Sequence, residues 1–111
     1  MYREKVQELQ SEIINLIYQK ASAILKDKES SILLPSAFRL DRTHNGYEGE
    51  YYTESLSITS LGMSDSSDRV CFITDSSQYI NLGEADIYQL AWVLDQFLSK
   101  KIRVENIEYP F

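Results

Sequence analysis

A change of hydrophobic period constrains the fold of this chain most: the period is helical at the start, strand-like in the middle and helical again near the end. From Tyr2 to about Lys26, apolar residues recur every three to four positions, and neither glycine nor proline interrupts the pattern. This spacing is typical of an amphipathic helix. The expected buried face holds Val6, Leu9, Ile13, Leu16, Ile17 and Ile24, with Ile14, Tyr18 and Leu25 beside it.

A second helix is predicted from about Glu84 to Lys100. Gly83 precedes it as the expected cap, and the acids Glu84 and Asp86 favour the positive end of the helix dipole. Its expected buried face holds Ile87, Leu90, Ala91, Leu94, Phe97 and Leu98.

Four strands are predicted between the two helices. The first, Ile32 to Arg42, contains Pro35 and is therefore either an edge strand or a strand that begins after the proline. A tight turn at Asn45-Gly46 would pair Leu40 with Tyr51 and Phe38 with Thr53. That register would point Leu56 and Ile58, which mark the second strand, away from the core. We therefore expect a longer loop through residues 43–50, or a bulge in the hairpin of residues 38–58.

The third strand, Val70 to Ile73, is apolar on both faces and is predicted to be central in the sheet. A tight turn at Ser76-Ser77 would then place Ile73 opposite Ile80 and Cys71 opposite Leu82. Residues 102–111 alternate weakly and are expected to add an edge strand or to dock as an arm.

The predicted order α-β-β-β-β-α, with a short C-terminal extension, indicates an α+β fold in which both helices cover one face of an antiparallel sheet. The 111 residues, 43% of them hydrophobic, suit one domain spanning residues 1–111 with a single modest core.

Charge argues against some functions and favours another. Seventeen acids against eleven bases give a net charge of −6, which does not suit direct nucleic-acid binding. Residues 47–83 hold six acids and one base, so a basic partner would be attracted there. No apolar run is long enough for a signal peptide or a membrane span, and the single cysteine excludes an intrachain disulfide. We expect a cytoplasmic protein.

No catalytic or cofactor motif is present. Cys71 lies in an apolar run, where a thiol is expected to be buried with a raised pKa. The four glycines are scattered singly, which does not fit a phosphate-binding loop. We therefore expect no enzyme, no cofactor and no metal.

One alternative is a metal or catalytic site at His44, Glu48 and Glu50, which lie close together across a turn. Glu48, Glu50 and Glu54 share strand parity and would line one side of an extended segment. A solvated acidic face is the simpler interpretation of that row.

Two segments carry features of an interaction surface. Tyr88 and Trp92 lie off the expected buried face of the second helix, where they would anchor a partner unless the first helix or the tail covers them. Tyrosines are interleaved with acids in a second segment, which holds Tyr47, Glu48, Glu50, Tyr51, Tyr52 and Glu54 and would present rings and negative charge to a basic partner. The alternative for this segment is an amphipathic hairpin whose tyrosine rings are half buried. The leading prediction is a small acidic, non-enzymatic interaction or regulatory module with a protein partner or a second copy. The alternative is an inhibitor or immunity-type protein, or a nucleic-acid mimic, that blocks a basic partner.

Overall fold

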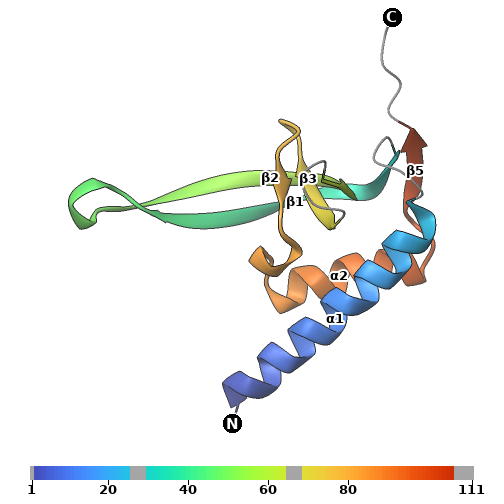
Figure 1. Ribbon diagram of the computed structural model, residues 1–111, viewed down its shortest axis with the longest axis horizontal. Helices are drawn as coiled ribbons and strands as arrows, with labels where there is room; N and C mark the ends of the chain where they lie inside the picture. Colours follow the sequence, from blue (N-terminus) through green and yellow to red (C-terminus); the bar gives the residue numbers. More distant parts are fainter. Residues whose placement is uncertain (1, 26–29, 65–68, 107–111) are drawn as a thin grey trace, which may run out of the picture.

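The computed structural model describes residues 2–25, 30–64 and 69–106 and confirms the α+β architecture (Figure 1). In chain order, the elements are α1 (Tyr2–Ile24), β1 (Ser30–Asn45), η1 (Tyr47–Gly49), β2 (Tyr51–Met63), β3 (Val70–Thr74), β4 (Tyr79–Ile80), η2 (Leu82–Glu84), α2 (Ile87–Leu98) and β5 (Arg103–Asn106). The five strands form one antiparallel sheet in the order β4-β3-β2-β1-β5.

Both helices lie on the same face of the sheet, and the core fills the space between the two layers (Figure 1). Alternate residues of each strand point to that face, so the strands contribute to the core at every second position. The largest fully buried side chains are Phe72, Ile17, Ile32, Leu40, Ile58, Leu61, Leu82, Leu90 and Val93. No helix in the described part of the chain is long and apolar enough to cross a membrane.

The long hairpin of β1 and β2 has the register that keeps its apolar residues on the core face. Leu40 lies opposite Leu56 and Phe38 opposite Ile58, which rules out the tight Asn45-Gly46 turn. The connecting loop spans residues 46–50 and is shorter than the loop through 43–50 that the sequence led us to expect. Pro35 lies in the irregular stretch of β1 between Leu33 and Phe38, where its missing N–H does not break the ladder.

The expected register of β3 and β4 is wrong by one residue. Phe72 lies opposite Ile80 and Ile73 opposite Tyr79. The loop has three residues, 75–77, instead of a two-residue turn, because Ser77 adopts a left-handed conformation (φ 64°) and the Thr74 N–H donates to the Gln78 carbonyl. One additional loop residue exchanges the two faces of the strand, so Phe72 points into the core in place of Ile73.

The helix faces also differ from those expected. α1 buries Ile17 and Ala21, whereas Leu9 and Leu16 remain exposed. α2 buries Leu90, Val93, Gln96 and Phe97, whereas Ala91 and Leu98 are exposed. In both helices the apolar arc is wider than the neighbouring elements can cover, and packing of α1 against α2 decides which part of it is buried.

The C-terminal extension forms an edge strand as far as the structure describes it. β5 pairs with the beginning of β1, from Leu33 opposite Arg103 to Ser30 opposite Asn106. This outcome agrees with the edge-strand alternative for residues 102–111. Residues 107–111 lie outside the described part of the chain.

Asp86, and not Gly83, caps α2. Its carboxylate accepts from the Gln89 N–H at 2.8 Å, and the Gln89 side chain accepts from the Asp86 N–H at 3.0 Å, which completes a capping box. Asp86→Ala should lower the free energy of unfolding by about 1 kcal/mol, because one N–H of the first helical turn loses its acceptor. Urea denaturation measures the effect, with Asp86→Asn as the control that keeps a capping oxygen. Equal stabilities of the two variants would contradict the role of the cap.

Candidate functional site

The β1–β2 hairpin projects from the body as a two-stranded arm (Figure 1). β3 pairs with β2 only from Ile58 onward, and β5 pairs with β1 only up to Leu33. Residues 39–57 therefore have no neighbouring strand on either side within the described sheet. We call residues 39–57 the arm and residues 46–52 its tip.

The tip turns sharply and leaves its side chains in solvent. Glu48 and Gly49 have positive φ angles of 61° and 79°, and the Gly46 N–H donates to the Glu50 carbonyl to close the loop. Tyr47 is 88% exposed and Tyr51 is 73% exposed. The predicted half burial of the tyrosine rings is thus wrong for Tyr47 and Tyr51, which lie mostly in solvent, whereas the Tyr52 ring stacks on His44.

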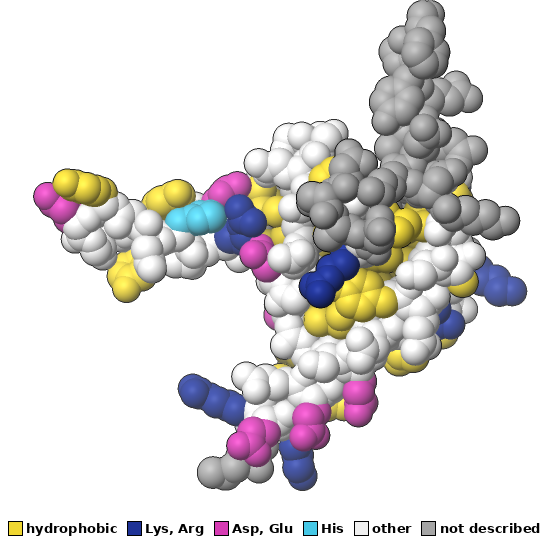
Figure 2. All heavy atoms as spheres, in the orientation of Figure 1, with side chains coloured by type: hydrophobic (Ala, Val, Ile, Leu, Met, Phe, Trp, Pro, Cys, Tyr) yellow, Lys and Arg dark blue, Asp and Glu magenta, His cyan; other side chains and the backbone are white. Residues whose placement is uncertain are grey.

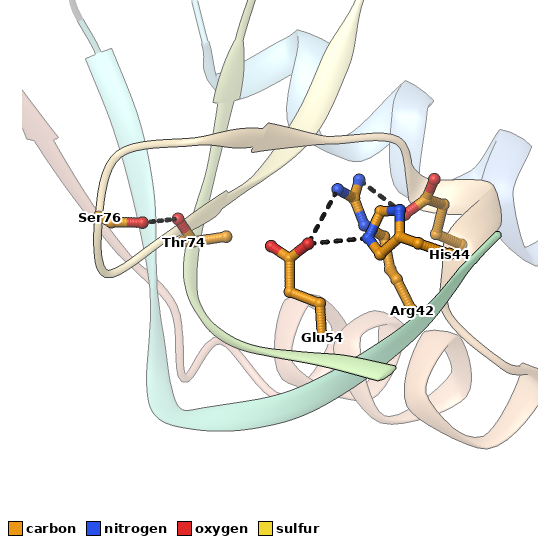
Figure 3. A network of polar contacts seen from close by, with 6 residues as sticks. Arg42, His44, Glu54, Thr74 and Ser76 are labelled. Carbon is orange, nitrogen blue, oxygen red and sulfur yellow. Dashed lines mark hydrogen bonds and ion pairs between the residues drawn. The ribbon is translucent and has the colours of Figure 1, made fainter. Parts of the chain in front are cut away.

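The inner face of the arm carries a polar network that joins it to the body (Figure 3). His44 Nε2 and Glu54 Oε2 are 2.8 Å apart, and the same carboxylate lies 3.7 Å from Arg42. Arg42 also pairs with Glu84 of η2 at 3.4 Å, and the His44 ring stacks on Tyr52 with centroids 5.0 Å apart. The Arg42–Glu84 pair joins the base of the arm to η2, and the other contacts connect the two strands of the arm.

The network overturns two expectations about the acids. Glu54 is taken up by Arg42 and His44, while Glu48 and Glu50 lie in the loop, so the three glutamates do not line one face. The His44 ring contacts Glu54 and stacks on Tyr52. No three His, Cys, Asp or Glu side chains within the described residues lie close enough to hold a metal ion, so the site at His44, Glu48 and Glu50 is not formed.

Charges on the outer face at the base of the arm are also paired. Arg39 binds Asp41 through two hydrogen bonds of 3.1 and 3.0 Å, and the Ser55 hydroxyl donates to the same carboxylate. The hydrogen bond from Arg39, followed by that from Ser55, lowers the pKa of the Asp41 carboxyl. Among the described residues, only Glu48 and Glu50 at the tip are arm acids without a basic partner.

The structure separates Tyr88 from Trp92. Tyr88 is 83% exposed, whereas Trp92 is partly buried with its ring edge-to-face on Phe38, the centroids 5.9 Å apart. Phe38 of β1 therefore covers part of the Trp92 ring. A shallow, mostly apolar cleft of about 380 Å³ lies beside Trp92 and Tyr88 of α2, and it is also lined by Ser36, Phe38, Asp86 and Gln89.

Gln89 closes one side of this cleft. Its side-chain amide donates to the Arg39 carbonyl at 2.7 Å and so satisfies a backbone acceptor on the open edge of β1. Sequence reasoning missed Gln89, Arg42 and Glu84 as connectors between arm and body. The partners lie 42 and 50 positions apart in the chain, and no local pattern could have paired them.

Cys71 offers no nucleophile. It is buried on β3, its Sγ lies 3.7 Å from the Arg69 carbonyl, and burial raises the pKa of the thiol, an effect that the charge of Arg69 partly offsets. A raised pKa keeps the thiol protonated near neutral pH and therefore unreactive.

Figure 2 shows the arm extending away from the body, with acidic and apolar side chains together at its far end. Neither a protein-family model, nor a curated protein, nor a solved structure matches this chain significantly.

Proposed function

We propose that the chain is a protein-interaction module whose arm tip binds a basic surface on a partner protein. The observation that carries this proposal is the exposure of Tyr47, Tyr51 and the unpaired Glu48 and Glu50 at the end of a projecting hairpin. Tyrosine rings provide large contact areas at a small cost in conformational entropy. Unpaired carboxylates attract a basic partner and accelerate its association.

Anchoring of the arm supports the proposal. An isolated two-stranded hairpin is marginally stable in water, so an arm of this kind needs support at its base. Leu40 and Leu56 are buried in the core, and the Arg42–Glu84 pair adds a connection to η2. The tip is thus presented in one orientation, which reduces the entropy lost on binding.

The two faces of the tip favour a partner groove over a flat surface. Tyr51 and Tyr52 are neighbours on one strand and therefore point to opposite faces of the arm, and both rings are exposed. A groove that receives the tip would contact both rings at once. Inhibition of a basic enzyme, or of a nucleic-acid-binding protein, by the inserted tip is one form of the same function.

Neutralising the tip acids tests the electrostatic part. Glu48→Gln with Glu50→Gln should weaken binding to the partner about tenfold at low salt and flatten its salt dependence. The immobilised wild-type chain is used to enrich a partner from extract of its source cells, and the affinity of the purified partner is then measured at several salt concentrations.

The matched control carries the same charge change outside the arm tip. Asp75→Asn with Asp95→Asn removes two exposed acids, on the β3–β4 loop and on α2, and should leave the affinity unchanged. Tyr47→Ser should weaken binding at every salt concentration, because it removes contact area and not charge. Equal binding of the wild type and both tip variants would refute the proposal.

A further inference from the structure

Exposed apolar side chains recur along α1 as a stripe on a side of the helix that the core does not bury, and Ile13, which packs partly on the core, borders them. Every seventh residue from Tyr2 is apolar and exposed: Tyr2, Leu9, Leu16 and Ala23. Leu9 is 50% exposed and Leu16 is 42% exposed, and the partly buried Val6 and Ile13 fill the intermediate positions. Alternating spacings of four and three residues are the pattern by which one helix packs along another.

The body covers a different side of the same helix. Ile17, Ala21 and Leu25 face the core, and Gln10 Nε2 donates to the Ala85 carbonyl at 3.0 Å. Leu16 precedes Ile17 by one residue and therefore points about 100° away from it around the helix. Figure 1 shows the N-terminal turns of α1 running past η2 and the start of α2, so no helix or strand of the described residues lies beside this end of α1.

The charges of α1 favour a second copy of the chain as the occupant. The helix contains three acids and three bases and is neutral, although the whole chain carries −6. Approach of two copies through α1 thus keeps the acidic arm tips out of the contact. Within residues 8–24, Glu8 and Glu12 precede Leu16 and Lys20 follows it, so opposite charges lie on the two sides of Leu16.

We propose that two copies of the chain associate through antiparallel α1 helices, with the two-fold axis at Leu16. In this arrangement Leu16 meets Leu16 of the second copy, and Leu9 packs on Ala23 of the second copy. Glu12 lies across the seam from Lys20 of the second copy, and the symmetry forms this ion pair twice. Antiparallel packing also brings each helix N-terminus towards the C-terminal end of its neighbour, which is favourable for the two dipoles.

The size of the contact sets the expected strength. With the axis at Leu16, residues 8–24 of the two helices lie alongside each other over about 25 Å, which provides a contact near the small end of stable interfaces. We therefore expect a dissociation constant of about micromolar order. The stripe is separate from the arm tip, so the tip variants described above should leave the self-association unchanged.

Light scattering after size-exclusion chromatography tests the proposal over a range of concentrations. The mass of the wild type should rise from 12.9 kDa towards twice that value as concentration increases. Leu9→Glu with Leu16→Glu should remain monomeric throughout, with an unchanged circular-dichroism spectrum because both side chains are exposed. The control Val104→Gln, which replaces a side chain 45% exposed on β5, should dimerise like the wild type.

Charge reversal distinguishes this arrangement from other dimers. Glu12→Lys alone should weaken the dimer about tenfold, because it places two bases across the seam. Glu12→Lys combined with Lys20→Glu should restore it, since each pair is then reversed.

A cross-link gives a reading that does not depend on the stability of the polar variants. Oxidised Leu16→Cys should form a covalent dimer, since identical residues meet at the two-fold axis, whereas Ser22→Cys should not. A wild type that stays monomeric at every concentration, or a dimer that survives Leu9→Glu with Leu16→Glu, would overturn the proposal.

Discussion

Phe72→Ala should lower the free energy of unfolding by about 3–5 kcal/mol, which would be the largest single effect in this protein. Phe72 is fully buried on β3, and its ring lies edge-to-face on Phe38 with centroids 5.4 Å apart. Alanine would leave a cavity between the sheet and the helices and would remove one side of the aromatic contact. Denaturation by urea, followed by circular dichroism, measures the change.

The control for Phe72 is Tyr79→Ala on the neighbouring strand. Tyr79 lies opposite Ile73 and is exposed, so its removal should cost less than about 1 kcal/mol. The pair also checks the register of β3 and β4. If the tight turn at Ser76-Ser77 were correct, Ile73 would be the core residue, and Ile73→Ala would be more damaging than Phe72→Ala.

Trp92→Ala should lower the free energy of unfolding by about 2–3 kcal/mol, whereas Tyr88→Ala should change it by less than about 0.5 kcal/mol. Trp92 extends the row of aromatic contacts from Phe72 through Phe38, and its loss would remove an edge-to-face contact as well as buried area. Tyr88 has no such contact and is almost fully exposed.

This comparison decides whether the two aromatic residues of α2 act together. If Tyr88 and Trp92 formed one interface, both would be dispensable for folding and both would be needed for binding. The structure instead makes Trp92 part of the packing that holds α2 on β1, and leaves Tyr88 as the free residue beside the cleft. Equal and small effects of the two substitutions would contradict this division.

The proposed partner surface and the proposed self-association use opposite properties of one chain. The arm tip is acidic and aromatic and suits a basic protein, whereas the stripe on α1 is apolar on a neutral helix and suits a second copy. A dimer formed through α1 would carry two arms. Two tips on one assembly would increase the effective affinity for a partner that offers two sites.

Sequence pattern determined those parts of the fold that depend on local periodicity. The bounds of α1 and the antiparallel order of the strands follow from the spacing of apolar residues along each segment. For β1 and β2 the pattern was sufficient only to argue against a tight Asn45-Gly46 turn, because that turn would point Leu56 and Ile58 away from the core; the pairing itself was decided by the tertiary structure. The acidic, tyrosine-rich tip was likewise visible as a string of residues.

Tertiary structure decided the rest. The single φ angle of Ser77 lengthens a loop by one residue and exchanges the faces of β3, an outcome that two adjacent serines do not specify. Glu54 meets Arg42 and His44, and Arg42 meets Glu84, only because the fold brings distant segments together. The exposure of Leu9 and Leu16 has the same origin. Periodicity determines which side chains share a face, but only the packing of whole elements determines how much of that face is covered and which charges become neighbours.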